Sequence, residues 1–200
     1  MSNKDDDFWT MFQGDDAPGA VPHKFRKFLH RETSSADFMQ TTAYYAYGYT
    51  RAFERLVMIA LRQWPNAEYL RMPTFFLARH AAELNLKGVV QQFSAANGAP
   101  DLASGQHRLL KLWAKARGHV AQAGWPTDDD WSRYCGKLIQ HLDYMDPNGQ
   151  RFRYPGDNAG KAFDYTRIEF QELARAHAHI TLWCEAATDT LNESGQDFHP

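Results

Sequence analysis

Apolar side chains recur at helical spacing in five separate stretches of this chain. No stretch alternates apolar and polar residues with the period of two that a half-buried strand requires. Segments rich in proline and glycine separate the five stretches. Because each helix of this kind has to bury its apolar stripe against its neighbours, we predict an all-α fold, an up-and-down bundle of about five helices.

The predicted helix ends follow from residues that start or stop helices. Pro73 suits the first position of a helix, and Gly118 suits the position just after a helix end. The segment 127–130 combines a threonine with aspartates that favour a first helical turn. We therefore predict helices that start near 34–37 and end before 65, and then cover about 74–96, 106–117, 127–144 and 166–191.

The first part of the chain differs from the rest. Residues 1–33 show no sustained apolar period, and they contain an acidic run, 1–16, and a basic run, 23–31. We predict that 1–33 form a tail and that 34–200 form the helical bundle. The chain lacks both an apolar run of roughly 20 residues, as a membrane span needs, and the basic and apolar regions of a signal peptide. We therefore expect no membrane partner and a cytoplasmic location.

Few residues suggest a metal or a cofactor. Cys135 and Cys184 are too few for a disulfide scaffold or a thiolate metal site, so we predict that both are reduced core residues. His80 and Glu83 are three positions apart on a predicted helix, but a metal would need further ligands from other helices. The sequence also lacks a glycine-rich phosphate-binding loop. We expect neither a metal nor a cofactor.

A carboxylate stands at the edge of the apolar stripe of the second predicted helix. Glu83 has Arg79 one turn before it and Lys87 one turn after it, at the spacing that allows ion pairs. Such a carboxylate needs partners, because burying a bare charge is costly. Two interpretations stay open: a structural ion pair that fixes the helix register, or a polar ligand site between helices, flanked by His80.

Two further segments bring basic residues together with aromatic or apolar ones. His107 falls in the first turn of the third predicted helix, within reach of Glu83, and Lys111 lies on a basic face of that helix. Arginine then alternates with aromatic residues in Arg151–Tyr154, a pattern that suits binding of a phosphate and stacking of a base. The alternative is that Tyr154 and Pro155 only close the end of the bundle.

These segments together resemble the HEPN domain family. Its second helix carries a Glu-x-x-x-Lys pattern, matched here by Glu83 and Lys87, and its third begins with His-x-Leu, matched from His107 onward. Many members have an Arg-Tyr-Pro turn before the last helix, matched here by residues 153–155. The resemblance covers about residues 37–192.

The resemblance implies a compact, commonly dimeric bundle that works in bacterial defence, toxin–antitoxin or nucleotidyltransferase-linked systems. Many members cleave RNA without a metal through an Arg-x(4–6)-His motif, in which histidine acts as acid or base beside a cation that steadies the phosphate charge. No arginine of this chain has a histidine at that spacing. We therefore expect a HEPN-like chain that binds RNA or a nucleotide without a standard nuclease centre.

The residues expected to bind the ligand are those that carry these patterns. They are Arg79, His80, Glu83, Lys87, His107, Lys111, Arg151, Arg153 and Tyr154. One alternative is a divergent metal-independent endoribonuclease that uses His80, His107 and Arg153. A second alternative is a protein-interaction or dimerisation module, which the tyrosines of the first helix favour. The expected partners are RNA or a nucleotide, a second copy of the chain, and a protein encoded nearby.

Overall fold

The computed structural model describes residues 29, 40–157, 159–164 and 166–196. The chain divides into two units, Met1–Ala36 and Asp37–Pro200. In the first unit only Leu29, which is exposed, is described, so the fold below is that of the second unit. The predicted start of the first helix, near 34–37, lies outside the described residues, and so does all of the predicted tail except Leu29.

Five α-helices make up the described part of the second unit. They are α1 (Thr42–Gln63), α2 (Arg71–Ala96), α3 (Leu109–Gln122), α4 (Asp130–Met145) and α5 (Phe170–Gln196). Within residues 40–157, 159–164 and 166–196 there is no strand, and a single isolated bridge pairs Gly156 with Ala162. The predicted all-α bundle of five helices is confirmed.

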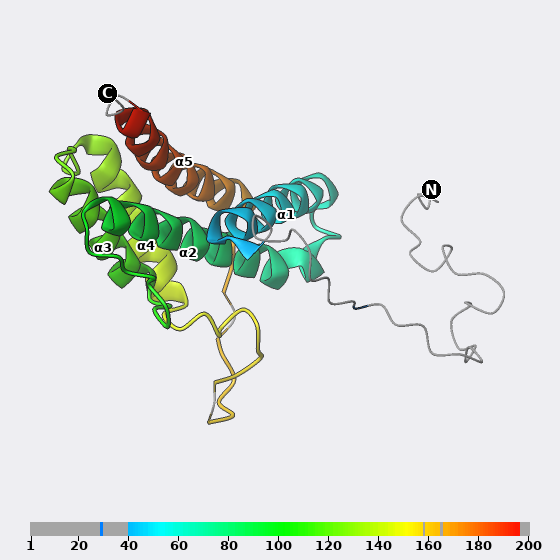
Figure 1. The fold of residues 1–200 in the computed structure, drawn as a ribbon. Coiled ribbons are helices and arrows are strands. Elements are labelled where there is room, and N and C mark those ends of the chain that lie inside the picture. Colours follow the sequence, from blue (N-terminus) through cyan, green and yellow to red (C-terminus); the bar gives the residue numbers. More distant parts are fainter. Residues whose placement is uncertain (1–28, 30–39, 158, 165, 197–200) are drawn as a thin grey trace. The chain divides into compact units, whose positions relative to one another are not determined.

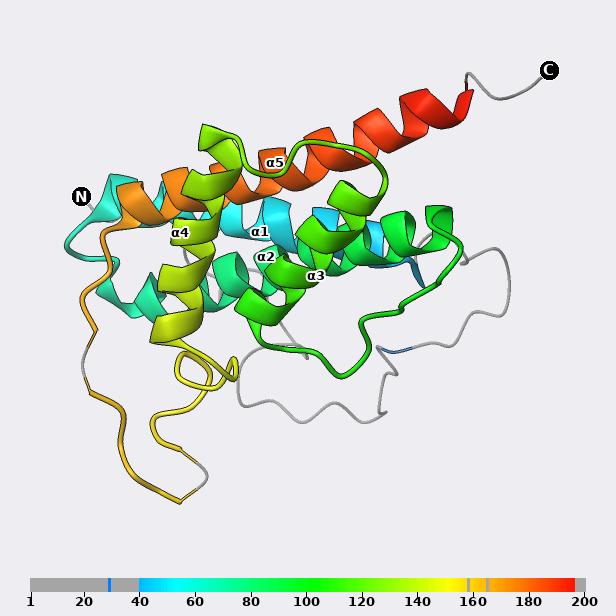
Figure 2. The ribbon, with the colours of Figure 1, turned by 90° about the vertical axis from the view of Figure 1, so that its left-hand side faces the viewer.

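Helix α2 forms the centre of the bundle, since it packs against α1, α3 and α5. Figure 2 shows α1, α2 and α5 running alongside one another, with α3 and α4 laid across them. The connection from α4 to α5 extends away from the helices (Figure 1). Fully buried side chains of several helices meet in the core, among them Phe53, Phe93, Leu112 and Ile139. Because α2 has neighbours on several sides, it has buried residues along most of its length.

The predicted end of α3 at Gly118 is wrong. The helix continues to Gln122, because one glycine costs a helix interior only about 1 kcal/mol, which packing against α2 and α4 offsets. It ends instead just before Gly124. The φ of Gly124 is +89°, a backbone conformation that glycine adopts without strain. This conformation lets the amide of Trp125 donate to the carbonyl of Val120, as at many helix ends.

The predicted starts of α2, α3, α4 and α5 also differ from the observed ones, by three or four residues each. Pro73 is the third residue of α2 rather than the first, because a 3₁₀ turn, Glu68–Leu70, leads directly into the helix. Proline is tolerated there, since the first turn of a helix has amides without partners in the helix. His107 precedes α3 instead of lying within it, because that helix begins at Leu109.

Helix α4 starts at Asp130, three residues after its predicted start. Asp129 caps the helix and accepts the amide of Ser132 at 2.9 Å. The Ser132 hydroxyl accepts the indole N–H of Trp183 at 3.0 Å, which joins α5 to the first turn of α4. Cys135 and Cys184 are free and buried, as predicted, and burial raises the pKa of both thiols.

Candidate functional site

Glu83 lies at the centre of a buried polar network on α2. Only 3% of its surface is exposed. Its Oε2 accepts a hydrogen bond from Arg79 at 3.0 Å, and its Oε1 accepts from Lys87 Nζ at 2.8 Å and from His107 Nδ1 at 3.0 Å. The predicted contact between Glu83 and the chain that enters the third helix is confirmed.

Arg79 is as buried as Glu83, and each nitrogen of its guanidinium has a partner. Nε donates to the backbone carbonyl of Asp146 at 2.9 Å, Nη2 donates to that of His107 at 2.7 Å, and Nη1 donates to Glu83. The planar fork of arginine suits several acceptors at once. Arg79 therefore joins α2 to the chain just before α3 and to the chain just after α4.

The turn after α4 is folded onto this network. Oδ1 of Asp146 accepts the backbone amides of Gln150 at 2.8 Å and Arg151 at 3.1 Å, which closes the turn. Gly149 in this turn has a φ of +69°, and a Cβ at this position would lie 3.0 Å from Nη1 of Arg79. A residue with a side chain would be strained there, so glycine allows the turn to approach Arg79.

The charges of the network keep Glu83 ionised. Burial on its own raises the pKa of a carboxyl group, but the hydrogen bonds from Lys87 and His107 outweigh it, together with the charges of Lys87 and Arg79. The pKa of Glu83 consequently lies below its ordinary value. Because three donors of the protein already occupy this carboxylate, the geometry favours the structural interpretation, an ion-pair network that fixes α2 against its neighbours.

Arg153 lies on the exposed, outer side of the turn. Its Nε donates to the carbonyl of Gly149, and its guanidinium carbon lies 5.7 Å from the ring centres of both Phe76 and Tyr154. Contacts of this kind between a cation and aromatic rings hold the guanidinium in place. Within the part of the chain that the structure describes, the two terminal nitrogens of Arg153 donate no hydrogen bond.

His80 lies next to the same phenylalanine. Its ring stacks on that of Phe76, with centres 5.6 Å apart, and meets the ring of Tyr49 edge-on at 4.4 Å. Burial lowers the pKa of His80, and nearby cations, Arg153 among them, add to this against the opposite effect of Glu83. His80 is therefore a neutral imidazole at physiological pH, which accepts or donates a hydrogen bond without carrying charge.

Lys111 and Arg151 take different places. Lys111 is exposed on α3. Arg151 donates through Nη2 to the carbonyl of Asp164 at 3.1 Å and to the hydroxyl of Thr166 at 3.0 Å. These two hydrogen bonds join the first part of the loop between α4 and α5 to its last part. In the described residues, the guanidinium of Arg151 is thus committed to the loop, whereas Lys111 has its ammonium at the surface.

Tyr154 does not share a cavity with the buried network. It is 57% exposed and lines a hollow of about 640 Å³ that the loop itself forms between Gln150 and Ala162. This hollow does not include Glu83 or His107. The predicted ligand residues therefore do not line one pocket. Tyr154 lies at the hollow in the loop, whereas Glu83 and its partners form a closed network.

Two buried carboxylates at the C-terminal end of α4, Asp143 and Asp146, were not predicted from the sequence. Asp143 accepts Nε of Arg108 at 3.2 Å and Nη2 at 2.8 Å, and Asp146 holds the turn described above. Both side chains are almost completely buried. The available signal was their spacing, because positions 139, 143 and 146 share one face of a helix and Ile139 is in the core.

The tyrosines of α1 lie largely at the surface. Tyr44, Tyr45 and Tyr47 are exposed, as are the apolar side chains of Ile59 and Leu61 further along the helix. Tyrosine suits surfaces that are partly covered by a partner. A homo-oligomer that uses this face stays a prediction, and so does a protein partner encoded nearby.

Among the residues that the structure describes, no three His, Cys, Asp or Glu side chains are grouped so that they could hold a metal ion. The described helices include none that is both long enough and apolar enough to cross a membrane. Comparisons of the chain with protein-family models, with curated proteins and with solved structures found no match.

Proposed function

We propose that this chain is a HEPN-like module that binds RNA or a nucleotide, in a bacterial defence or toxin–antitoxin setting, and that has no standard nuclease centre. One observation carries the proposal: the guanidinium of Arg153 is exposed on a turn that Arg79 holds against α2, and it lies beside Phe76 and Tyr154. A cation next to aromatic rings matches the two parts of a nucleotide, since the cation attracts phosphate and a ring stacks on a base.

A second polar group lies at the surface beside the same network. The side chain of His107 is 62% exposed, and its backbone carbonyl accepts a hydrogen bond from Arg79, against which Gly149 also packs. Arg79 therefore supports both the backbone at His107 and the turn in which Arg153 binds the carbonyl of Gly149. The buried network acts here as the support, and the groups that contact the ligand are the exposed Arg153, Tyr154 and His107.

We expect the Arg153→Gln variant to bind single-stranded RNA about 10- to 100-fold more weakly than the wild type, because an unmade hydrogen bond to a charged group costs about 1.5–3 kcal/mol. Fluorescence anisotropy with a labelled RNA oligonucleotide measures the dissociation constant. Calorimetric titration with ATP tests whether a mononucleotide suffices. The melting temperature should change little, because Arg153 is exposed.

Arg175→Gln is the matched control for this experiment. Arg175 is an exposed arginine on α5 that pairs with Glu172 at 2.9 Å, and its loss removes the same charge from the protein. We expect this variant to bind RNA as the wild type does. Equal weakening by both variants would mean that only net charge matters, and an absence of binding by the wild type at millimolar ATP and micromolar RNA would contradict the proposal.

A divergent endoribonuclease is the second candidate, and one contact favours it. His107 Nδ1 donates to the buried carboxylate of Glu83, which orients the imidazole and leaves Nε2 on the exposed side of the ring. A histidine held in this way by a carboxylate is suited to acid–base catalysis.

The two candidates differ in what happens to RNA in metal-free buffer. Under the proposed function, the purified wild-type protein leaves single-stranded and structured RNA intact over hours, as gel electrophoresis would show. Cleavage that disappears in the His107→Ala variant, and persists in a control with exposed His141 changed to alanine, would establish the endoribonuclease instead.

A further inference from the structure

The imidazole of His107 has one edge bound to the protein and one edge open. Its Nδ1 lies 3.0 Å from Oε1 of Glu83, and the side chain is 62% exposed. Glu83 is an ionised carboxylate that also accepts hydrogen bonds from Arg79 and Lys87, so it has no proton to donate. The contact therefore requires the proton of the neutral ring on Nδ1, which leaves Nε2 as a hydrogen-bond acceptor.

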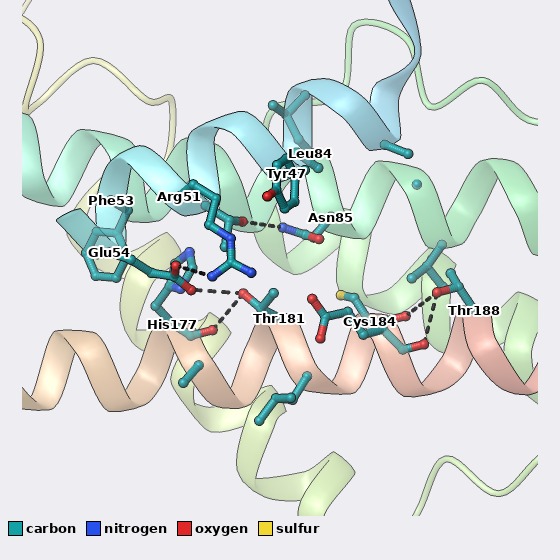
Figure 3. Close-up of a pocket in the computed structure, with 18 of the residues that line it drawn as sticks. Tyr47, Arg51, Phe53, Glu54, Leu84, Asn85, His177, Thr181, Cys184 and Thr188 are labelled. Carbon is teal, nitrogen blue, oxygen red and sulfur yellow. Dashed lines mark hydrogen bonds and ion pairs between the residues drawn. The ribbon is translucent and has the colours of Figure 1, made fainter. Parts of the chain in front are cut away.

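The position of this acceptor distinguishes His107 from His177. His177 lies in the wall of a cavity of about 660 Å³ between α1, α2 and α5 (Figure 3). Its Nε2 is buried, so a ligand in that cavity cannot reach it. In His107 the Nδ1 edge faces the protein and most of the side chain is exposed, so Nε2 faces the solvent. Within the residues that the structure describes, no hydrogen bond occupies Nε2 of His107.

Two exposed cations lie a short way from His107, one along the chain and one across the network. Lys111 follows His107 by four positions, in the first turn of α3. Across the network, Nη2 of Arg79 donates to the carbonyl of His107 at 2.7 Å. A Cβ at Gly149 would lie 3.0 Å from Nη1 of the same Arg79 and 3.6 Å from Nη2 of Arg153. Because these contacts are short, a single strand of a few nucleotides can contact both His107 and Arg153.

A bare acceptor discriminates between the groups of a nucleic acid. Phosphate oxygens accept hydrogen bonds and do not donate them, so they bind cations and leave Nε2 of His107 without a partner. In the sugar–phosphate backbone the donor is the ribose 2′-hydroxyl, which RNA carries and DNA lacks. Donors on the bases are common to both nucleic acids. An acceptor fixed beside exposed cations therefore favours RNA, because the cations hold the phosphates while the acceptor meets the hydroxyl.

We propose that Nε2 of His107 accepts a hydrogen bond from a ribose 2′-hydroxyl, so that the ligand of this surface is single-stranded RNA and not DNA. Glu83 is the positioning residue, since its carboxylate fixes the proton on Nδ1 and holds the ring with Nε2 outward. The inference rests on the proposed binding of RNA at Arg153, and it adds the group by which the chain selects its ligand.

Fluorescence anisotropy with three labelled oligomers of uridine tests this assignment, at about pH 8, where imidazole groups are neutral. The oligomers have equal length and carry a hydroxyl, a hydrogen or a fluorine at the 2′ position. The fluoro strand keeps the sugar conformation of RNA but cannot donate a hydrogen bond. We expect the full-length wild type to bind the ribose strand about three- to tenfold more tightly than either of the others, the effect of one hydrogen bond. Equal affinity for the ribose and fluoro strands would overturn the proposal.

The His107→Asn variant assigns the preference to one atom. The amide of asparagine can donate to Glu83 in place of Nδ1, but it has no acceptor at the position of Nε2. We expect this variant to bind the deoxy strand as the wild type does, which also shows that it is folded, and to bind the ribose strand no more tightly. A preference for ribose that survives in His107→Asn would contradict the assignment.

Lys111→Gln is the matched control, because it removes a charge close to His107 without changing the acceptor. We expect it to weaken binding of the ribose and deoxy strands by the same factor, so that their ratio is unchanged. The two proposals fail in different ways. A wild type that binds none of the strands contradicts the proposed function itself. Equal binding of ribose and deoxy strands, weakened in Arg153→Gln, leaves the proposed site in place and overturns only the role of His107.

Discussion

We expect the Glu83→Gln variant to lose about 3 kcal/mol of the free energy of unfolding, the lower end of the cost of breaking a buried ion pair. Glutamine has the same shape as glutamate, so the change removes the charge without opening a cavity. Arg79 then remains buried beside the ammonium of Lys87. The loss stays at the lower end because the carboxylate of Asp146, 3.5 Å from Nε of Arg79, is still present.

Urea denaturation at pH 7, followed by circular dichroism, measures this loss. Glu172→Gln is the control, because Glu172 pairs with Arg175 on the exposed face of α5, where such pairs contribute about 1 kcal/mol or less. If Glu83→Gln cost no more than Glu172→Gln, the network around Glu83 would not be the support that holds the turn after α4.

The second large effect is a dependence of stability on pH that comes from His177. Its pKa is lowered by burial from 6.5 to about 4, so the unfolded chain binds more protons than the folded chain between these two values. The stability that the neutral ring allows is fully present above pH 6.5 and is lost as the pH falls toward 4. From the size of the shift, we expect a loss of about 3 kcal/mol between pH 7 and pH 4.

Comparison with His177→Leu isolates this contribution. The carboxylates of the protein also titrate in this range, but they do so in both proteins and cancel in the difference between the two stability curves. The difference should favour the variant by about 3 kcal/mol more at pH 4 than at pH 7. Parallel curves, measured by urea denaturation across this range, would mean that His177 takes up its proton in the folded protein as easily as in the unfolded chain.

The helices could be predicted from the sequence because their signals are local. An apolar stripe and a cap such as Asp129 lie within one segment, so the segment alone defines them. The ends that were mispredicted depend on information from outside the segment. Gly118 is compatible with either a helix interior or a helix end, and only the packing of α3 on α2 and α4 decides between them.

The contacts of the candidate site were likewise predictable only in part. Contacts one turn apart, such as those of Glu83 with Arg79 and Lys87, follow from helical geometry, and the contact with His107 was predicted too. The spacing of Asp146 could have indicated its burial, but its hydrogen-bond partners could not be predicted, because they depend on how α4 lies across the bundle.

The most direct test of the proposed function is an NMR titration of the isotope-labelled protein with a single-stranded RNA oligonucleotide. We predict that the largest changes in amide chemical shift occur at residues 149–154, with further changes around Phe76 and His80. The exposed face of α1 should be unaffected. Changes confined to that face, near Tyr44 and Tyr45, or no change at residues 149–154, would contradict the claim that the turn after α4 is the ligand-binding surface.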